Sequence, residues 1–499
     1  MASMYMYDVR GIQSYIFRTN KIKEIMGASH IVQDVILNTF YDSCKDIVKV
    51  KKYKDIKDKE VYFNFDSGNP KDYAEIMYYG GGNLFVFFEN EEKAELVNKK
   101  MRIELAKKTY SLQLAVASEK IHGSNTYEED MKNLRKKMNE VKLNMPAMLP
   151  VRSFPFTMND PQTGMPFSRI GKDGLMITYE SDKKLKAFRK IDEDDSEYRI
   201  LNEFGTELGE SMIAVVHIDG NNMGDYIKGK IGSIGTYTEA TKVMRKISSD
   251  IDDVFTNIAL ENVRKKVPYF CEKRGVKKDF LPFRTIIHAG DDITFVCNAR
   301  IALDCVKEYA ESIEEANKQY SSNFSVCGGM FIMHSHFPFA RAYELAEELC
   351  SNAKVCSRPI ISDEEKGAAN FIDFQVSYSG LLNDMDTIRE RYFVDSEGNE
   401  LLGRPYHIGK NSLSTLHGAQ EIEALEKMLQ TVSNLPRSKV KSLRESFYDG
   451  KEYVDMDLLR INSRISDEDK KIVCKEEKDY RILFDAIDIM DLKWGENHE

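Results

Sequence analysis

The sequence predicts an α+β protein made of two related ferredoxin-like units followed by a C-terminal helical domain. Three observations support this prediction. The spacing of apolar residues alternates between strand-like and helix-like segments along most of the chain. A short N-terminal segment recurs near residue 219, and each copy is followed at nearly the same distance by a strand–turn–strand pattern. The regular order of these segments indicates an internal duplication.

The duplication begins with residues 8–16 and 219–227. Aligned without a gap, both segments start with Asp and end with Tyr-Ile. Each is followed by two apolar runs around a Gly-containing turn, at residues 76–88 and 284–296, which is typical of a β-hairpin. The distance from Asp8 to Asn83 is 75 residues, and the distance from Asp219 to Asp292 is 73. The two hairpins therefore occupy equivalent places in the two units.

The remaining elements follow in the same order in both units. Each hairpin is followed by a helix, a strand and a second helix, expected at residues 91–108, 112–117 and 128–141 in the first unit and at residues 299–319, 324–333 and 339–354 in the second. The order strand, helix, hairpin, helix, strand, helix is typical of a ferredoxin-like palm with an antiparallel sheet and helices on one face.

Four regions are expected along the chain: a first palm-like unit at 1–145, a connector with a small insertion at 146–205, a second palm at 206–375 and a helical domain at 376–499. The connector begins with a proline-rich stretch, 146–170, which holds five of the 12 prolines. Helical periodicity in the last region predicts helices at 415–432, 438–447, 453–461 and 467–489.

Composition limits the classes of function. The 499 residues contain 71 Lys and Arg and 81 Asp and Glu, so the net charge is −10. Proteins whose main function is to bind nucleic acid usually carry a net positive charge, so the composition does not favour that class. No stretch approaches the roughly 20 apolar residues that span a membrane, and no secretory leader is evident. The eight cysteines form no CxxC pair, which favours reduced thiols and a cytoplasmic protein without a zinc site.

Three acidic residues in the second unit form the candidate catalytic and metal-binding site. Asp219 ends a strand, and Asp291 and Asp292 lie in the hairpin turn of a neighbouring strand. Carboxylates held together repel one another unless a cation joins them, and oxygen ligands select Mg²⁺ or Mn²⁺. Such ions activate a hydroxyl and neutralise a pyrophosphate leaving group, which is the chemistry of nucleotidyl transfer.

Residues around these acids are candidates for binding a triphosphate. Backbone N–H groups of Gly220, Asn221 and Asn222 precede a helix, and Gly290 lets the turn approach a phosphate closely. Lys354 ends the predicted helix 339–354, where it either reaches a β- or γ-phosphate or only complements the helix dipole. Histidines 217 and 288 are interpreted as supporting or core residues, and His334 and His336 as structural.

At these residues the chain resembles the large palm-polymerase subunit of type III CRISPR effector complexes, whose signature is a Gly-Gly-Asp-Asp hairpin (GGDD motif). The resemblance covers roughly residues 1–450. It rests on the segments 8–17, 23–29, 217–224, 288–292, 327–330, 337–354 and 403–406.

The resemblance implies a nucleotide cyclase or polymerase fold that converts ATP, or another nucleoside triphosphate, into a cyclic oligoadenylate or related messenger for antiviral defence. It maps Asp219, Asp291 and Asp292 onto the metal-binding acids. It also maps Ser29 and the turn at residues 80–82, including Gly81 and Gly82, onto a nucleotide pocket of the first palm. Implied partners are nucleoside triphosphates, RNA or CRISPR ribonucleoprotein subunits, and an effector that responds to the product.

Some features depart from the family pattern. The chain starts at the first palm and contains no His-Asp dipeptide, so an HD nuclease is not expected. The two interpretations are a stand-alone synthase and a reduced subunit of an effector complex. In the first palm, Gly82 and Asn83 replace the paired acids, so no metal pair is expected there. Ala289 replaces the first signature glycine, which predicts a strained turn costing about 1 kcal/mol if its φ is positive. Two other functions stay open: a non-catalytic scaffold subunit, and a purine mononucleotide or dinucleotide cyclase.

Overall fold

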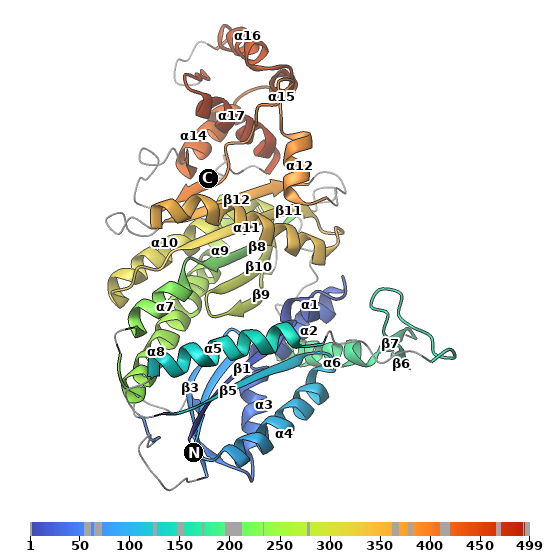
Figure 1. Ribbon diagram of the computed structural model, residues 1–499. Helices are drawn as coiled ribbons and strands as arrows, with labels where there is room; N and C mark the ends of the chain where they lie inside the picture. The colour runs from blue at the N-terminus through green and yellow to red at the C-terminus, as the bar shows by residue number, and fades with distance from the viewer. Residues whose placement is uncertain are drawn as a thin grey trace. The chain divides into compact units, whose positions relative to one another are not determined.

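The computed structural model contains two compact units (Figure 1). It describes residues 2–53, 61–63, 72–122, 127–146, 154–171, 174–194, 212–232, 234–276, 280–361, 369–377, 383–409, 420–465, 471–492 and 494. The first unit comprises Met1–Tyr198, Asn222–Asp253 and Ile286–Asp291, and the second comprises Arg199–Asn221, Val254–Thr285 and Asp292–Glu499. Parts of the expected connector, including 195–205, and the starts of the helices expected at 415 and 467 lie outside the described residues.

The first unit contains a five-stranded sheet in the order β2-β3-β4-β1-β5. Its strands are β1 (Ser3–Arg10), β2 (Lys49–Val50), β3 (Tyr73–Gly80), β4 (Asn83–Phe88) and β5 (Gln113–Lys120). Apart from the short β2, the order β3-β4-β1-β5 with antiparallel pairing is that of a ferredoxin-like unit. Alternating side chains on β1 place Met4 on one face and Tyr5 and Tyr7 on the other, and all three are buried.

Helices cover both faces of this sheet. On the face of Tyr7, α3 (Val35–Cys44) packs against α4 (Glu91–Thr109), and the Tyr7 hydroxyl donates to Asn98 of α4 at 2.6 Å. On the other face, Met4 lies in one core with α5 (Tyr127–Asn144), α7 (Met223–Ile231) and α8 (Tyr237–Ile251). The expectation of helices on one face is therefore wrong, because α5 and α8 bury the second apolar face of the same strands.

The helices α7 and α8 follow the first strand of the second palm in sequence, yet they group with the first unit. Residues 206–375 therefore do not form one compact unit by themselves, and the expected domain boundaries stay a prediction. The first unit also contains α1 (Ile12–Ile16), α2 (Ile22–Gln33) and α6 (Tyr179–Asp194). Gly27 allows α2 and α6 to pack closely, since a Cβ there would lie 1.8 Å from the carbonyl oxygen of Lys184.

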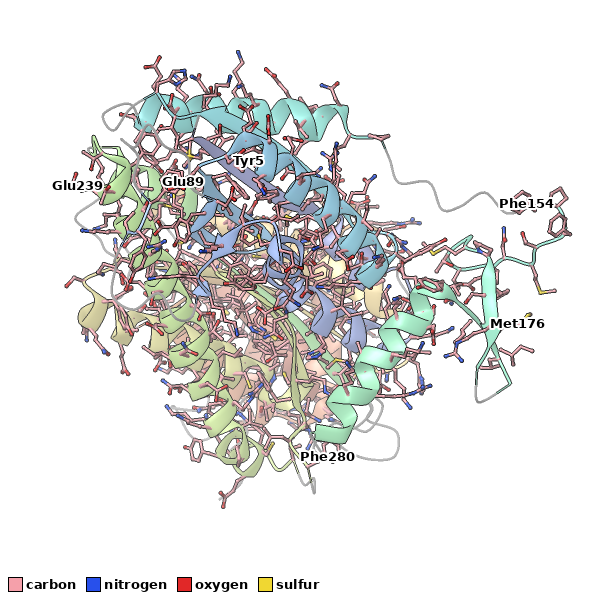
Figure 2. All side chains as sticks on the ribbon, turned by 90° about the horizontal axis from the view of Figure 1, so that it is seen from below. Tyr5, Glu89, Phe154, Met176, Glu239 and Phe280 are labelled. Atoms are coloured by element: carbon pink, nitrogen blue, oxygen red, sulfur yellow. The ribbon has the colours of Figure 1, made fainter. Side chains whose placement is uncertain are left out.

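The connector forms a small arm before α6. Its two strands, β6 (Phe167–Ile170) and β7 (Met176–Thr178), pair with one another and with no strand of the larger sheets. Phe154 and Phe156 stack with ring centroids 5.4 Å apart but remain 60% and 85% exposed. Figure 2 shows Phe154 and Met176 on this arm. The proline-rich stretch is thus irregular over part of its length, as its composition predicts.

A seven-stranded sheet in the order β14-β13-β12-β11-β8-β10-β9 belongs to the second unit, except for residues 286–289 at the end of β9. Its strands are β8 (Met212–Gly220), β9 (Phe283–Ala289), β10 (Asp292–Asn298), β11 (Val326–His334), β12 (Asn370–Val376), β13 (Tyr406–Ile408) and β14 (Gln420–Glu421). The order β9-β10-β8-β11 repeats β3-β4-β1-β5 of the first sheet. The duplication and the α+β fold of two palm units are therefore confirmed.

One helix of the second unit lies unusually close to its sheet. The helix α11 (Phe339–Ile361) packs on β8, β11 and β12, and a Cβ at Gly329 of β11 would lie 1.9 Å from the carbonyl oxygen of Ala346. A continuous helical run includes a π-helical segment (Asp252–Leu260) and α9 (Glu261–Lys273), and α9 packs against α10 (Ala302–Tyr320). The absence of a side chain at Gly329 therefore sets the distance between α11 and the sheet.

A helical region ends the chain, as predicted. It consists of α12 (Met385–Tyr392), α14 (Ile422–Ser433), α15 (Arg437–Asp449), α16 (Lys451–Asn462) and α17 (Glu477–Ile489). The fully buried guanidinium of Arg404 ties the sheet to α17 through Asp485 at 3.0 Å and Asp488 at 2.9 Å. Within the described residues, no helix is both long enough and apolar enough to cross a membrane.

Candidate nucleotide-binding and metal site

Strand pairing brings two of the predicted acids face to face. In the antiparallel pair of β8 and β10, Ile218 is opposite Ile293 and His217 is opposite Thr294. Continuing this register by one residue places Asp219 opposite Asp292. Residues directly opposite in an antiparallel pair have Cα atoms about 4.5–5.5 Å apart. The two carboxylates therefore start from adjacent backbone positions at one end of the sheet.

Lys354 lies beside Asp219. Its ammonium group donates to Asp219 Oδ2 and lies 3.4 Å from the carbonyl oxygen of Gly220. Burial alone would lower the pKa of Lys354, but the charge and hydrogen bond of Asp219 raise it above its ordinary value. Because α11 continues to Ile361, Lys354 is not at the C-terminus of the helix, and the predicted role of complementing the helix dipole is wrong.

The donor set fits an open cation site. Among the residues that the structure describes, no three His, Cys, Asp or Glu side chains are gathered as a closed metal cage. Mg²⁺ is usually held by one or two carboxylates together with substrate phosphates. Asp219 and Asp292 would supply those carboxylates, with Asp291 next to Asp292 in the turn. Asp219 forms an ion pair with Lys354.

The signature turn is built differently from the expectation. Gly290 and Asp291 connect β9 to β10, and Gly290 has φ +72° while Asp291 is not among the residues with positive φ. Of the two central positions of this turn, only the first, which Gly290 occupies, therefore favours glycine. Ala289 is the last residue of β9 and also lacks a positive φ, so the predicted strain there is wrong.

Two asparagines follow β8. Asn221 forms hydrogen bonds to the residues that immediately precede β11 and β12, and Asn222 lies at the start of α7. The side-chain amide of Asn221 donates to Ser325 Oγ at 3.0 Å and to the Ala369 carbonyl oxygen at 3.1 Å. Asn222 adopts a left-handed φ of 52° and caps α7 without a side-chain hydrogen bond. The amide of Asn221 thus fixes the end of β8, which carries Asp219. The backbone of this segment stays the predicted phosphate cradle.

The first unit repeats part of this arrangement. Asp8 is opposite Asn83, the same register as Asp219 and Asp292, and the carboxylate of Asp8 forms an ion pair with Lys142 of α5. The Asp–Lys spacing is 134 residues in the first unit and 135 in the second. The duplication therefore preserves the acid–lysine pair but not the second carboxylate. Sequence reasoning missed Lys142, although the nearly equal spacing was the signal that could have found it.

The residues predicted for the first pocket lie in two places of the first unit. Gly81 and Gly82 form the β3–β4 turn with φ of +56° and +78°, so both central positions require glycine. Ser29 of α2 donates its hydroxyl to the carbonyl oxygen of Ile286. Nearby, Gln33 Nε2 lies 3.1 Å from His288 Nε2. The role of Ser29, Gly81 and Gly82 in nucleotide binding stays a prediction.

His217 is closer to the acids than the sequence indicates. Its Nδ1 lies 3.1 Å from Thr294 Oγ1 and 3.4 Å from Asp292 Oδ1, and its ring contacts Tyr343 of α11. Burial and, to a smaller extent, the charge of Lys354 lower the pKa of His217 to about 4, despite the opposing charge of Asp219. The imidazole is therefore neutral at pH 7.

Comparisons with known proteins support the palm fold around these residues. Residues 212–359 match the family model of the second palm domain of Cas10/Cmr2. The solved structure of Csm1 in T. onnurineus matches with a TM-score of 0.52 and 14% identity, over 99% of this chain and 70% of that chain. The Csm1-Csm4 cassette in complex with cA4 matches with a TM-score of 0.51 at 14% identity, again over 99% and 70%.

A third match is the Csm1-Csm4 subcomplex of the type III-A CRISPR-Csm interference complex, with a TM-score of 0.51, 14% identity and the same coverage of 99% and 70%. No curated protein matches the chain by sequence. At this identity the structural matches establish the fold, and the family match covers the palm that carries Asp219, Asp291 and Asp292. Residues 212–359 are therefore similar to the second palm domain of Cas10/Cmr2, and the chain shares its fold with Csm1, in agreement with the resemblance to the type III CRISPR palm-polymerase subunit.

Proposed function

We propose that the chain is a nucleotidyltransferase that requires Mg²⁺ or Mn²⁺ and joins ATP, or another nucleoside triphosphate, into a cyclic oligonucleotide. The observation that carries this proposal is the position of Asp219 opposite Asp292 at one end of the sheet, with Lys354 paired to Asp219. Two carboxylates and one lysine are suited to a triphosphate with its cation, since carboxylates hold the ion and the ammonium group binds phosphate oxygens.

The reaction is a substitution at the α-phosphorus. A ribose hydroxyl oxygen of one nucleotide bonds to the α-phosphorus of another, the bond to the β-phosphate breaks, and pyrophosphate leaves with its electron pair. The hydroxyl proton is released to a base. A bound divalent ion would supply charge neutralisation at the phosphates and at the attacking oxygen. Closing the product into a ring repeats the same substitution within one molecule.

The residues of this chain would position the reactants. Asp219 and Asp292 would hold the cation, and Asp291 extends the acidic turn. Lys354 would move from Asp219 to the triphosphate, because the divalent ion replaces it as the counter-charge of the carboxylate. Gly290 allows the turn to approach a phosphate, and the amide of Asn221 keeps the end of β8 in place. Catalysis of this kind depends on positioning and charge neutralisation.

The proposed biological role is messenger synthesis in antiviral defence. Structures of similar fold include a Csm1-Csm4 cassette with cA4 and another with one ATP, which associates this fold with nucleotides. By the same analogy, we propose a protein subunit of an effector complex as a partner. The exposed apolar side chains of the arm, such as Phe154 and Phe156, favour such a partner. A non-catalytic scaffold is the alternative, and it predicts association without product.

The test is an analysis of products. The purified protein is incubated with ATP, GTP, CTP and UTP, singly and mixed, with Mg²⁺ or Mn²⁺, and the products are analysed by mass spectrometry. We expect a cyclic nucleotide product that is lost when Asp291→Ala and Asp292→Ala are combined. Asp449→Ala, at an exposed site on α15, is the matched control and should keep full activity. Full turnover by the double variant would contradict the site assignment.

A further inference from the structure

His217, Thr294, Asp219 and Asp292 form a block on one face of the sheet. Residues two apart in a strand point to the same face, so His217 shares a face with Asp219, and Thr294 with Asp292. The pairing of His217 with Thr294 places the two strands in register. The face is the one that α11 covers, since Tyr343 of α11 contacts the His217 ring with centroids 5.5 Å apart. The histidine therefore lies directly behind the pair of acids.

His217 approaches a buried oxygen of Asp292. The side chain of His217 is 6% exposed and that of Asp292 is 30% exposed. Asp292 Oδ1 is the carboxylate oxygen nearest to His217 Nδ1, and this oxygen is buried. The exposed part of the Asp292 side chain therefore consists of its other atoms. The 3.4 Å contact is long for a hydrogen bond, as is common in catalytic sites before substrate binds. This arrangement leaves Oδ2 as the oxygen that can face a cation.

The chemistry of the two groups determines the position of the imidazole proton. A carboxylate only accepts hydrogen bonds, whereas a neutral imidazole donates from one nitrogen and accepts at the other. If Nδ1 carried a lone pair, that lone pair would face the charge of Asp292 in a buried place. A proton on Nδ1 instead has two oxygens within reach, Thr294 Oγ1 at 3.1 Å and Asp292 Oδ1 at 3.4 Å. The contact with Asp292 therefore favours the tautomer protonated at Nδ1.

We propose that His217 is a positioning residue, which donates from Nδ1 to Asp292 Oδ1 and holds the other carboxylate oxygen toward the metal. This inference rests on the proposed function of the acids and adds a residue to it. Hydrogen bonds behind a metal ligand set its orientation, and their loss typically weakens metal affinity 10–100-fold. His217 itself touches neither metal nor substrate in this role.

The test uses three substitutions at one position. His217→Asn places an amide donor near Nδ1, His217→Gln places it near Nε2, and His217→Leu removes it. The first readout is Mn²⁺ affinity of the full-length protein without nucleotide, measured by titration calorimetry. We expect a loss of about 10–100-fold for His217→Leu and His217→Gln, and near wild-type affinity for His217→Asn. Asp449→Ala, at an exposed site on α15, is the control and should keep the affinity.

The second readout separates positioning from general stability. Where product forms, His217→Leu should lower kcat with little change in the nucleotide KM, and thermal unfolding will show whether each variant is folded. A folded His217→Leu protein with wild-type Mn²⁺ affinity would overturn the inference, as would equal losses in His217→Asn and His217→Leu. Failure of the proposed function looks different: wild-type protein would then bind no Mn²⁺, or would bind it equally well after Asp219→Asn.

Discussion

Gly329→Ala tests how the sheet positions α11 and, through it, Lys354. A Cβ at residue 329 would lie 1.9 Å from the Ala346 carbonyl oxygen, 2.4 Å from the Cys350 nitrogen and 2.8 Å from Leu349 Cβ. Non-bonded atoms of this kind prefer about 3.5 Å, so α11 would have to move outward by roughly 1.5 Å. Overpacking of this kind typically costs about 1–3 kcal/mol, and we expect the upper part of that range because two of the three contacts are with helix backbone.

The neighbouring glycine is a matched control. A Cβ at Gly328 would meet the Ile372 Cδ1 atom at 3.0 Å and the Ile218 Cγ1 atom at 3.4 Å. The nearest of these atoms is the end of a flexible side chain, which can move at little cost. Gly328→Ala should therefore change the free energy of unfolding by less than Gly329→Ala, although both substitutions add the same methyl group to the same strand.

The assay can follow the second unit by itself. Trp494 is the single tryptophan of the chain, is 1% exposed, and packs against Phe374 of β12 with ring centroids 5.8 Å apart. Its fluorescence during urea unfolding therefore reports on the sheet that contains both glycines. The prediction includes a functional effect, weaker nucleotide binding by Gly329→Ala, because Lys354 moves with α11. Equal stability of the two variants would refute the packing argument.

Two further predictions concern the signature turn and the buried ion network. Gly290→Ala should destabilise the protein by about 1–2 kcal/mol, because the φ of residue 290 is +72°. Ala289→Gly should bring no gain in stability, since residue 289 is the last residue of a strand. Urea unfolding of both variants tests these two expectations. A more stable Ala289→Gly protein would show that the turn is strained there. Arg404→Met should cost about 3–5 kcal/mol, because it removes the guanidinium that pairs with the buried carboxylate of Asp485 and one of the ion pairs of Asp488. An unchanged thermal midpoint would contradict this.

The duplication was predictable because its signals are local and repeated. Asp8 precedes Asn83 by 75 residues, and Asp219 precedes Asp292 by 73, so the spacing identifies the corresponding strands of the two units. The pairing of Asp8 with Asn83 in the first sheet agrees with this correspondence. The acid pair in the second palm followed from the same alignment. Lys142 was hidden, because a lysine in the charged helix α5 has the pattern of an ordinary exposed residue.

Other features depend on long-range packing that periodicity does not encode. The helices α7 and α8 follow β8 in sequence, but their apolar residues, such as Tyr237 and Met244, complete the core of the first sheet. An amphipathic pattern shows that a face is buried and not which sheet buries it. The strands β13 and β14 have three and two residues, too few for an alternating pattern. The turn at Ala289 was misread because sequence does not show where the strand ends.

The measurement that tests the central claim most directly is the position of bound Mn²⁺ in a crystal of the protein with a non-hydrolysable ATP analogue. Anomalous scattering locates the ion independently of the surrounding density. We predict a peak bridging the carboxylates of Asp219 and Asp292 and the phosphates, with Lys354 released from Asp219 onto the triphosphate. A peak elsewhere, or nucleotide bound while Lys354 still pairs with Asp219, would contradict the assignment of these acids as the metal site.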